Sequence, residues 1–168
     1  MATGTSDTGG PHCARRAWLR AFAIRGTARS PHEEEMQVSA QAESPVRVLT
    51  VDDHAGFRTV AREVVSATPG FTAVGEARDG AAALEAVDRL HPALVIVDVC
   101  MPGMSGFEVA RRIHEADPDT VVLLVSSHDL ADAAATRACG ARAFIRKEQM
   151  RPAMLRGLWT VHGGHSPQ

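Results

Sequence analysis

The sequence has no tyrosine and a single lysine, Lys147, among its 168 residues. All of the other basic residues are arginines, so the position of the lone side-chain ammonium is itself informative. The 18 basic and 20 acidic residues nearly balance, which gives a formal net charge of −2. This balance argues against a protein that binds nucleic acid mainly through overall positive charge.

The chain also lacks a long apolar segment, because no run approaches the ~20 residues that a membrane-spanning helix needs. A secretory signal is not expected either, since the N-terminal region has no continuous apolar stretch before a cleavage site. The three cysteines, Cys13, Cys100 and Cys139, are widely spaced and odd in number. They fit neither a disulfide framework nor a zinc-ligand pattern. We therefore expect a cytoplasmic protein with no membrane span.

The composition divides the chain into two parts. Residues 1–44 combine scattered glycine and proline with a basic and then an acidic stretch, which predicts a disordered N-terminal tail. Two alternatives are a short basic amphipathic helix over residues 14–24 and a natural start of the protein at Met36. Residues 45–163 are predicted to form one ordered domain, and residues 164–168 a frayed C-terminus.

Strand-like and helix-like patterns alternate five times in the ordered part. The unbroken apolar run at 94–97 is typical of a parallel strand buried on both faces, whereas the apolar side chains of 57–64 recur at helical spacing. The alternation predicts an α/β fold, with a doubly wound, mostly parallel sheet and helices on both faces. The predicted strands are residues 46–51, 71–77, 93–99, 121–125 and 143–145.

Charged and hydroxyl side chains stand where the predicted strands end. Asp52 and Asp53 follow the first strand, Asp98 ends the third, Ser126 the fourth and Lys147 the fifth. Because ligands of such folds bind at the carboxyl ends of the strands, we expect these groups to converge. Two carboxylates about 5 Å apart repel each other by about 3 kcal/mol at an effective dielectric constant of about 20, so the cluster needs a cation or raised pKa values. Oxygen ligands with room for water fit Mg²⁺ or Mn²⁺.

Five motifs occur in order at these strand ends: Val51-Asp52-Asp53-His54, Val97-Asp98-Val99, the loop 101–106, Ser126 and the segment 140–147. Together they resemble the receiver domain of bacterial response regulators, the CheY-like superfamily, in its stand-alone, single-domain form. The resemblance covers about residues 46–163. It implies a flavodoxin-like, five-stranded parallel sheet with the strand order 2-1-3-4-5.

The resemblance also implies a phosphoacceptor role for the strand-end acids. Asp98 would take a phosphoryl group from a phosphohistidine of a sensor histidine kinase or a phosphotransfer protein. Asp53, with Asp52, Asp98 and the backbone carbonyl of Cys100, would hold Mg²⁺ (or Mn²⁺). A carboxylate is a competent nucleophile towards phosphorus, which agrees with the role implied for Asp98.

Three further residues receive roles from the same resemblance. Lys147 would pair with the phosphoryl group as a compact point charge, Ser126 would bond to one of its oxygens, and Phe144 would occupy the switch-aromatic position. The segment that follows Ser126 is slightly shorter than is usual in the family, so Ser127 is an alternative candidate for the switch hydroxyl. His54, beside the two acids, is interpreted as a solvated or helix-capping residue.

The predicted function is that of a phosphoacceptor response regulator in a two-component phosphorelay, which catalyses only its own phosphorylation and dephosphorylation. Its output would be a phosphorylation-dependent contact of residues 130–138, Phe144 and residues 150–159 with an unknown downstream protein. We expect a monomer or weak dimer, and no DNA binding by this chain, because the sequence contains no helix-turn-helix module. The alternatives are a receiver fragment of a DNA-binding transcriptional regulator and a receiver-like scaffold that is never phosphorylated.

Overall fold

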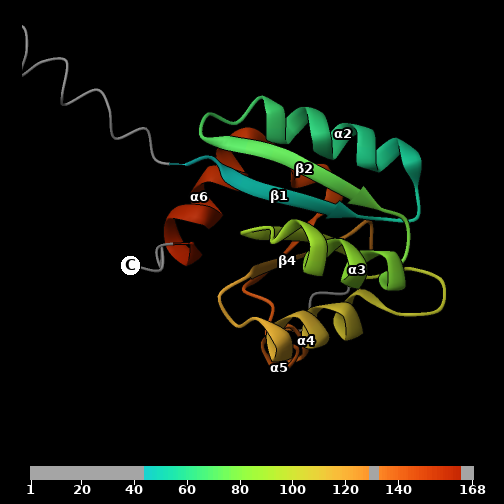
Figure 1. Ribbon diagram of the computed structural model, residues 1–168. Helices are drawn as coiled ribbons and strands as arrows, with labels where there is room; N and C mark the ends of the chain where they lie inside the picture. The colour runs from blue at the N-terminus through green and yellow to red at the C-terminus, as the bar shows by residue number, and fades with distance from the viewer. Residues whose placement is uncertain (1–43, 129–132, 164–168) are drawn as a thin grey trace, which may run out of the picture. The chain divides into compact units, whose positions relative to one another are not determined.

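The computed structural model describes residues 44–128 and 133–163, within which strands and helices alternate as predicted (Figure 1). Three parts of the prediction lie outside the described residues: residues 1–43 of the tail, the first residues of the helix 130–138, and the terminus 164–168. The strands are β1 (Val46–Val51), β2 (Phe71–Ala77), β3 (Leu94–Asp98), β4 (Val121–Ser126) and β5 (Ala143–Arg146). The helices are α2 (Ala55–Ser66), α3 (Gly80–Leu90), α4 (Gly106–Ala116), α5 (Ala133–Ala138), the 3₁₀ turn η1 (Lys147–Gln149) and α6 (Pro152–His162).

The five strands form one parallel sheet in the order β2-β1-β3-β4-β5. This order confirms the flavodoxin-like topology that the resemblance implied. Because all strands run in the same direction, their carboxyl ends meet at one edge of the sheet. The pairs at this edge are Val51 with Val97, Asp98 with Val125, and Ser126 with Arg146.

Two hydrophobic clusters cover the opposite faces of the sheet. Leu49 belongs to the cluster that packs against α3 and α4, whereas its neighbour Val48 belongs to the cluster that packs against α2 and α6. Successive residues of a strand point to opposite faces, so β1 contributes to both clusters. Figure 1 shows α2 on one side of the sheet and α3 and α4 on the other. The residues after the strands therefore emerge from a scaffold that is fixed on both faces.

The helices begin at residues that suit a helix start. The side chain of Asp79 accepts a hydrogen bond from Ala82 N at the start of α3, and Ser105 caps α4 through Glu108 N. Pro152 occupies the first turn of α6, where a missing backbone N–H costs no hydrogen bond. Among the described residues, no helix has the length and apolar character needed to cross a membrane.

Trp159 lies on α6 at the margin of the core. Its ring meets Phe71 of β2 edge to face, with 6.1 Å between the ring centroids and an angle of 78° between the planes. The indole is half-buried and packs against the cluster beneath α2 and α6. This contact helps to hold α6 against β2.

Candidate functional site

The carboxyl edge of the sheet brings Lys147 into contact with two buried aspartates. The Lys147 Nζ atom lies 2.6 Å from Asp52 Oδ2 and 3.0 Å from Asp98 Oδ2. The exposed fractions of the side chains are 0% for Asp52, 4% for Asp98 and 11% for Lys147. Asp52 follows β1, Asp98 ends β3 and Lys147 begins η1 directly after β5. Three separate strand ends therefore supply one ion-paired centre.

The electrostatics of this centre follow from burial and from the shared ammonium. Desolvation by burial raises the pKa of Asp98 above its ordinary value, although the hydrogen bond from Lys147 acts in the opposite direction. Burial would lower the pKa of Lys147, but its hydrogen bonds to Asp52 and Asp98 outweigh burial and raise the pKa. Lys147 therefore stays protonated at neutral pH. One ammonium faces three carboxylates, because Asp53 lies in the same group.

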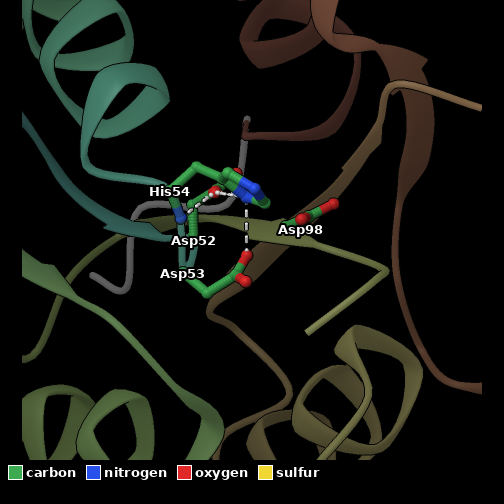
Figure 2. A group of neighbouring side chains, drawn as sticks. All are labelled: Asp52, Asp53, His54 and Asp98. Carbon is green, nitrogen blue, oxygen red and sulfur yellow. Dashed lines mark hydrogen bonds and ion pairs between the residues drawn. The ribbon is translucent and has the colours of Figure 1, made fainter. Parts of the chain in front are cut away.

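The acids and one histidine form a group that fits a divalent cation (Figure 2). Asp52, Asp53, His54 and Asp98 each offer a ligand atom, and these atoms lie within 4.8 Å of one another. The Asp53 side chain is 27% exposed, so water has access to the group from that side. Hard carboxylate oxygens that leave room for water are the ligands that Mg²⁺ prefers, and they also suit Mn²⁺.

His54 lies beside the two acids and contacts one of them. It stands at the N-cap position of α2, but its side chain makes no hydrogen bond to the helix amides. The His54 Nδ1 atom instead lies 2.9 Å from Asp53 Oδ1, and the backbone N–H of His54 donates to Asp52 Oδ1 at 2.8 Å. Figure 2 shows the ring joined to the Asp53 carboxylate. The ring is exposed, as the solvated alternative of the prediction expected, and His54 is the N-cap residue of α2 although its side chain does not bond to the helix amides.

A cavity of about 370 Å³ opens beside Asp98 and Lys147. Ser126 is buried and its Oγ accepts a hydrogen bond from the backbone N–H of His128, whereas Ser127 is exposed. Both serines line the cavity beside the acids. The lining residues are His54, Gly56, Phe57, Val60, Asp98, Cys100, Ser126, Ser127, His128 and Lys147.

Cys100 and Phe144 lie near the site in different ways. The thiol of Cys100 is free and exposed, and its backbone N–H donates to Asp98 Oδ1 at 3.3 Å. Phe144 on β5 is half-buried and packs against the cluster beneath α3 and α4. The carbonyl-ligand role of Cys100 and the switch role of Phe144 stay predictions.

Two residues of α2 support the site and were not identified from the sequence. The Phe57 ring lies below Lys147, with the Nζ atom 4.6 Å from the ring centroid, a distance at which a cation–π interaction contributes. Arg58 donates to the backbone carbonyl of Asp52 at 2.7 Å and also reaches Glu76. Phe57 has the helical spacing of a core residue, so the sequence pattern gave no indication of its contact with Lys147. We find no sequence signal that would have indicated Arg58.

Gly106 packs directly against the backbone of Asp98, and its replacement by alanine is expected to destabilise the protein by about 2 kcal/mol. A Cβ atom at this position would lie 2.2 Å from the carbonyl oxygen of Asp98, a backbone atom that cannot turn away. Urea unfolding of the Gly106→Ala variant measures the loss. Gly157→Ala in α6 is the matched control, because its Cβ meets nothing within 4 Å and alanine favours a helix. Equal stability of the two variants would contradict the expected clash.

Comparison with known proteins adds to this geometry. The family model of the response regulator receiver domain matches residues 48–158. The chain is 40% identical over 105 residues to a protein-glutamate methylesterase/protein-glutamine glutaminase of Myxococcus xanthus, covering 61% of this chain and 30% of that protein. It is 32% identical over 124 residues to the nitrate/nitrite response regulator protein NarL of Escherichia coli, covering 73% of this chain and 57% of that protein. The chain thus spans between about a third and just over half of the length of these relatives.

Two solved structures have the same architecture. The signal receiver domain of a NarL response regulator from Mycobacterium tuberculosis superposes with a TM-score of 0.65 and 35% identity, covering 73% of this chain and 99% of that one. The response regulator domain of CheB from Thermotoga maritima superposes with a TM-score of 0.64 and 29% identity, with the same coverage. The first is described as a signal receiver domain and the second as a response regulator domain, which agrees with the match of the family model.

Proposed function

The chain belongs to the response regulator receiver domain family, and from this premise we propose that Asp98 is its phosphoacceptor. The donor would be a phosphohistidine of a sensor histidine kinase or of a phosphotransfer protein. One observation carries the proposal: the Asp98 carboxylate is buried at a strand end, 3.0 Å from the only lysine of the chain, and borders a cavity. A buried acid beside a cation, with an open approach, is the arrangement that an attacking carboxylate needs.

In the proposed transfer, a carboxylate oxygen of Asp98 forms a bond to phosphorus while the bond from phosphorus to the donor imidazole breaks. The imidazole nitrogen keeps the electron pair and takes up a proton. Lys147 offsets charge on the phosphoryl oxygens as a compact point charge. A hydroxyl from Ser126, or from Ser127, donates to a phosphoryl oxygen. Phe144 then turns towards the space that the hydroxyl leaves, which is the proposed switch.

Asp52, Asp53, Asp98 and the backbone carbonyl of Cys100 are the residues that would hold Mg²⁺ (or Mn²⁺). Such an ion, when bound, neutralises negative charge that develops on a transferring phosphoryl group. The group of carboxylate ligand atoms within 4.8 Å supports this assignment. Lys147 already pairs with Asp52 and Asp98, so the side chain of Asp53 is the most accessible ligand.

The output of the domain is proposed to be a phosphorylation-dependent protein contact through residues 130–138, Phe144 and residues 150–159. We propose residues 45–163 as the receiver domain, between tails 1–44 and 164–168, acting in the cytoplasm as a monomer or weak dimer. The receiver itself would be catalytic only in its own phosphorylation and dephosphorylation. A second candidate is the receiver part of a longer regulator, because NarL and the methylesterase extend well beyond the matched region.

The test of the proposed function is incubation of the full chain with a small acyl phosphodonor and Mg²⁺, followed by intact-mass measurement. We expect the mass of one phosphoryl group to be added, and we expect no added mass when EDTA is present from the start of the incubation. Hydroxylamine should release the label, because it cleaves acyl phosphates and leaves phosphoserine intact. A chain that takes up no label, or a label that resists hydroxylamine, would contradict the proposal.

A further inference from the structure

The backbone carbonyl of Asp52 is buried at a place where neither the sheet nor a helix provides a hydrogen-bond donor. Asp52 is 0% exposed, and the pairing of β1 with both of its neighbours ends one residue earlier, at Val51. Helix α2 begins only at Ala55. A buried backbone carbonyl without a donor is costly, so this strand end needs a partner from another part of the chain.

Arg58, in the first half of α2, provides that partner. Its Nη1 atom donates to the carbonyl oxygen of Asp52 at 2.7 Å, and its Nε atom donates to Glu76 Oε2 at 3.3 Å. The Arg58 side chain is only 18% exposed, although it carries a charge. A guanidinium presents several N–H groups in one rigid plane. Arg58 therefore ties the end of β1 to a carboxylate of β2 through two different nitrogen atoms.

Glu76 holds the guanidinium in this direction. It lies on β2 in register with Thr50 of β1. Its other oxygen, Oε1, accepts a hydrogen bond from Arg62 Nη1 at 2.6 Å, and the Arg62 side chain is 52% exposed. Two arginines of α2 thus share one carboxylate, and of the two it is the less exposed Arg58 that also reaches the backbone of Asp52.

The carbonyl that Arg58 holds belongs to the peptide group between Asp52 and Asp53. Because a peptide group is planar, a bond that holds its oxygen also holds the N–H of Asp53. The N–H of Asp52 donates to the carbonyl of Ala77 at 3.1 Å, and His54 N–H donates to Asp52 Oδ1 at 2.8 Å. Asp52 is therefore fixed on both sides of its backbone, and the direction of the more exposed Asp53 side chain depends on this peptide group.

We propose that Arg58 is a positioning residue, which aims the Asp53 carboxylate at the acid group by holding the carbonyl of Asp52. Without this bond the peptide group is free to turn, and Asp53 no longer keeps its place among ligand atoms that lie within 4.8 Å of one another. Groups that orient metal ligands commonly change the affinity tenfold or more when they are removed. The inference rests on the proposed function for the use of Asp53 as a Mg²⁺ ligand, but it does not involve phosphoryl transfer.

The test is an NMR titration of the full chain with Mg²⁺, in the absence of a phosphodonor. In the Arg58→Met variant, the Mg²⁺ affinity should fall about tenfold. The carbonyl ¹³C signal of Asp52 should also shift in the metal-free variant, because its hydrogen bond is lost. Arg58→Lys keeps the charge, but a single ammonium does not reproduce the planar fork, so its affinity should lie between those of the wild type and Arg58→Met. Arg58→Lys decides the test if Arg58→Met does not fold.

The matched control is Arg62→Met, which removes the other arginine from Glu76 and leaves the bond to Asp52 in place. This variant should bind Mg²⁺ as the wild type does, and its Asp52 carbonyl signal should not move. Wild-type Mg²⁺ affinity in Arg58→Met, even with a lower melting temperature, would overturn the inference, because Arg58 would then only satisfy a buried carbonyl.

Two further outcomes separate the possible causes. An equal change of Mg²⁺ affinity in Arg58→Met and Arg62→Met would also overturn the inference, because the change would then follow from the loss of one positive charge. A chain whose Mg²⁺ binding depends on Arg58, but which takes up no phosphoryl group, would refute the proposed function and leave the positioning role of Arg58 intact.

Discussion

Replacing Asp98 by asparagine is expected to abolish uptake of the phosphoryl group from a small phosphodonor. The amide that replaces the carboxylate carries no charge and is a poor nucleophile, so no acyl phosphate forms at this position. The fold is expected to remain intact, because the substitution removes one of two buried carboxylates that lie near the same ammonium and so relieves their repulsion. Intact-mass measurement after incubation with the phosphodonor and Mg²⁺ gives the result directly.

The control for this experiment is Asp88→Asn on the exposed side of α3. That variant should take up one phosphoryl group as the wild type does, since its carboxylate has no contact with the site. Asp53→Asn is informative in another way, because we expect it to label slowly and only at high Mg²⁺ concentration. Labelling of Asp98→Asn at the wild-type level would show that another group is the acceptor.

Replacing Lys147 by methionine is expected to lower the free energy of unfolding by about 3 kcal/mol, the usual cost when one partner of a buried ion pair is removed. Methionine keeps much of the length and apolar volume of the side chain but leaves Asp52 and Asp98 without their cation. Both acids are almost fully buried, so water solvates them less well than the lost ammonium did. For a domain of this size the loss corresponds to a fall of about 10 °C in the melting temperature.

The stability contribution of Lys147 has a defined pH range. Desolvation by burial acts to lower its pKa in the folded state, but the hydrogen bonds to Asp52 and Asp98 outweigh desolvation and raise the pKa. A raised pKa means that the contribution is complete below the ordinary lysine pKa and is lost as the pH rises through the raised value. The difference between wild type and Lys147→Met should therefore persist across neutral pH and narrow only in alkaline solution, or in acid where Asp98, whose pKa is raised by burial, becomes protonated.

Guanidinium unfolding measures this loss, and two further variants separate its causes. Arg146→Met removes the neighbouring charge, whose ion pair with Glu148 is exposed, and should cost less than about 1 kcal/mol. In the Lys147→Met background, Asp98→Asn should restore part of the stability, because it removes one of the two carboxylates left without a cation. A Lys147→Met variant as stable as the wild type would contradict the ion-paired centre.

The sequence predicted the strands well because their apolar patterns are strong. The run at 94–97 became the fully buried strand β3, and β2 has the predicted limits of Phe71–Ala77. The order of the strands came from the resemblance to a known family, since local patterns do not determine which strands become neighbours. A shift in the pairing of β1 with β2, between Val48 and Leu49, was not predicted, because it depends on packing between strands.

The site was partly predictable from the sequence, because its residues stand at the ends of the predicted strands. Strand ends of a parallel sheet meet at one edge, so Asp52, Asp98 and Lys147 were expected to lie together, and they do. The contacts of His54 with Asp53 and of Phe57 with Lys147 were not predicted. Both depend on side-chain rotamers, and the contact of Phe57 with Lys147 also joins elements far apart in the sequence, so no local pattern encodes it.

The central claim is that the phosphoryl group is carried by Asp98, and reduction of the phosphorylated chain with borohydride tests it most directly. Borohydride converts an aspartyl phosphate into homoserine and leaves free aspartate unchanged, so peptide mapping by mass spectrometry identifies the acceptor. The account predicts homoserine at position 98, present only after incubation with phosphodonor and Mg²⁺. Homoserine at position 52 or 53, or a phosphorylated protein in which no homoserine forms, would contradict it.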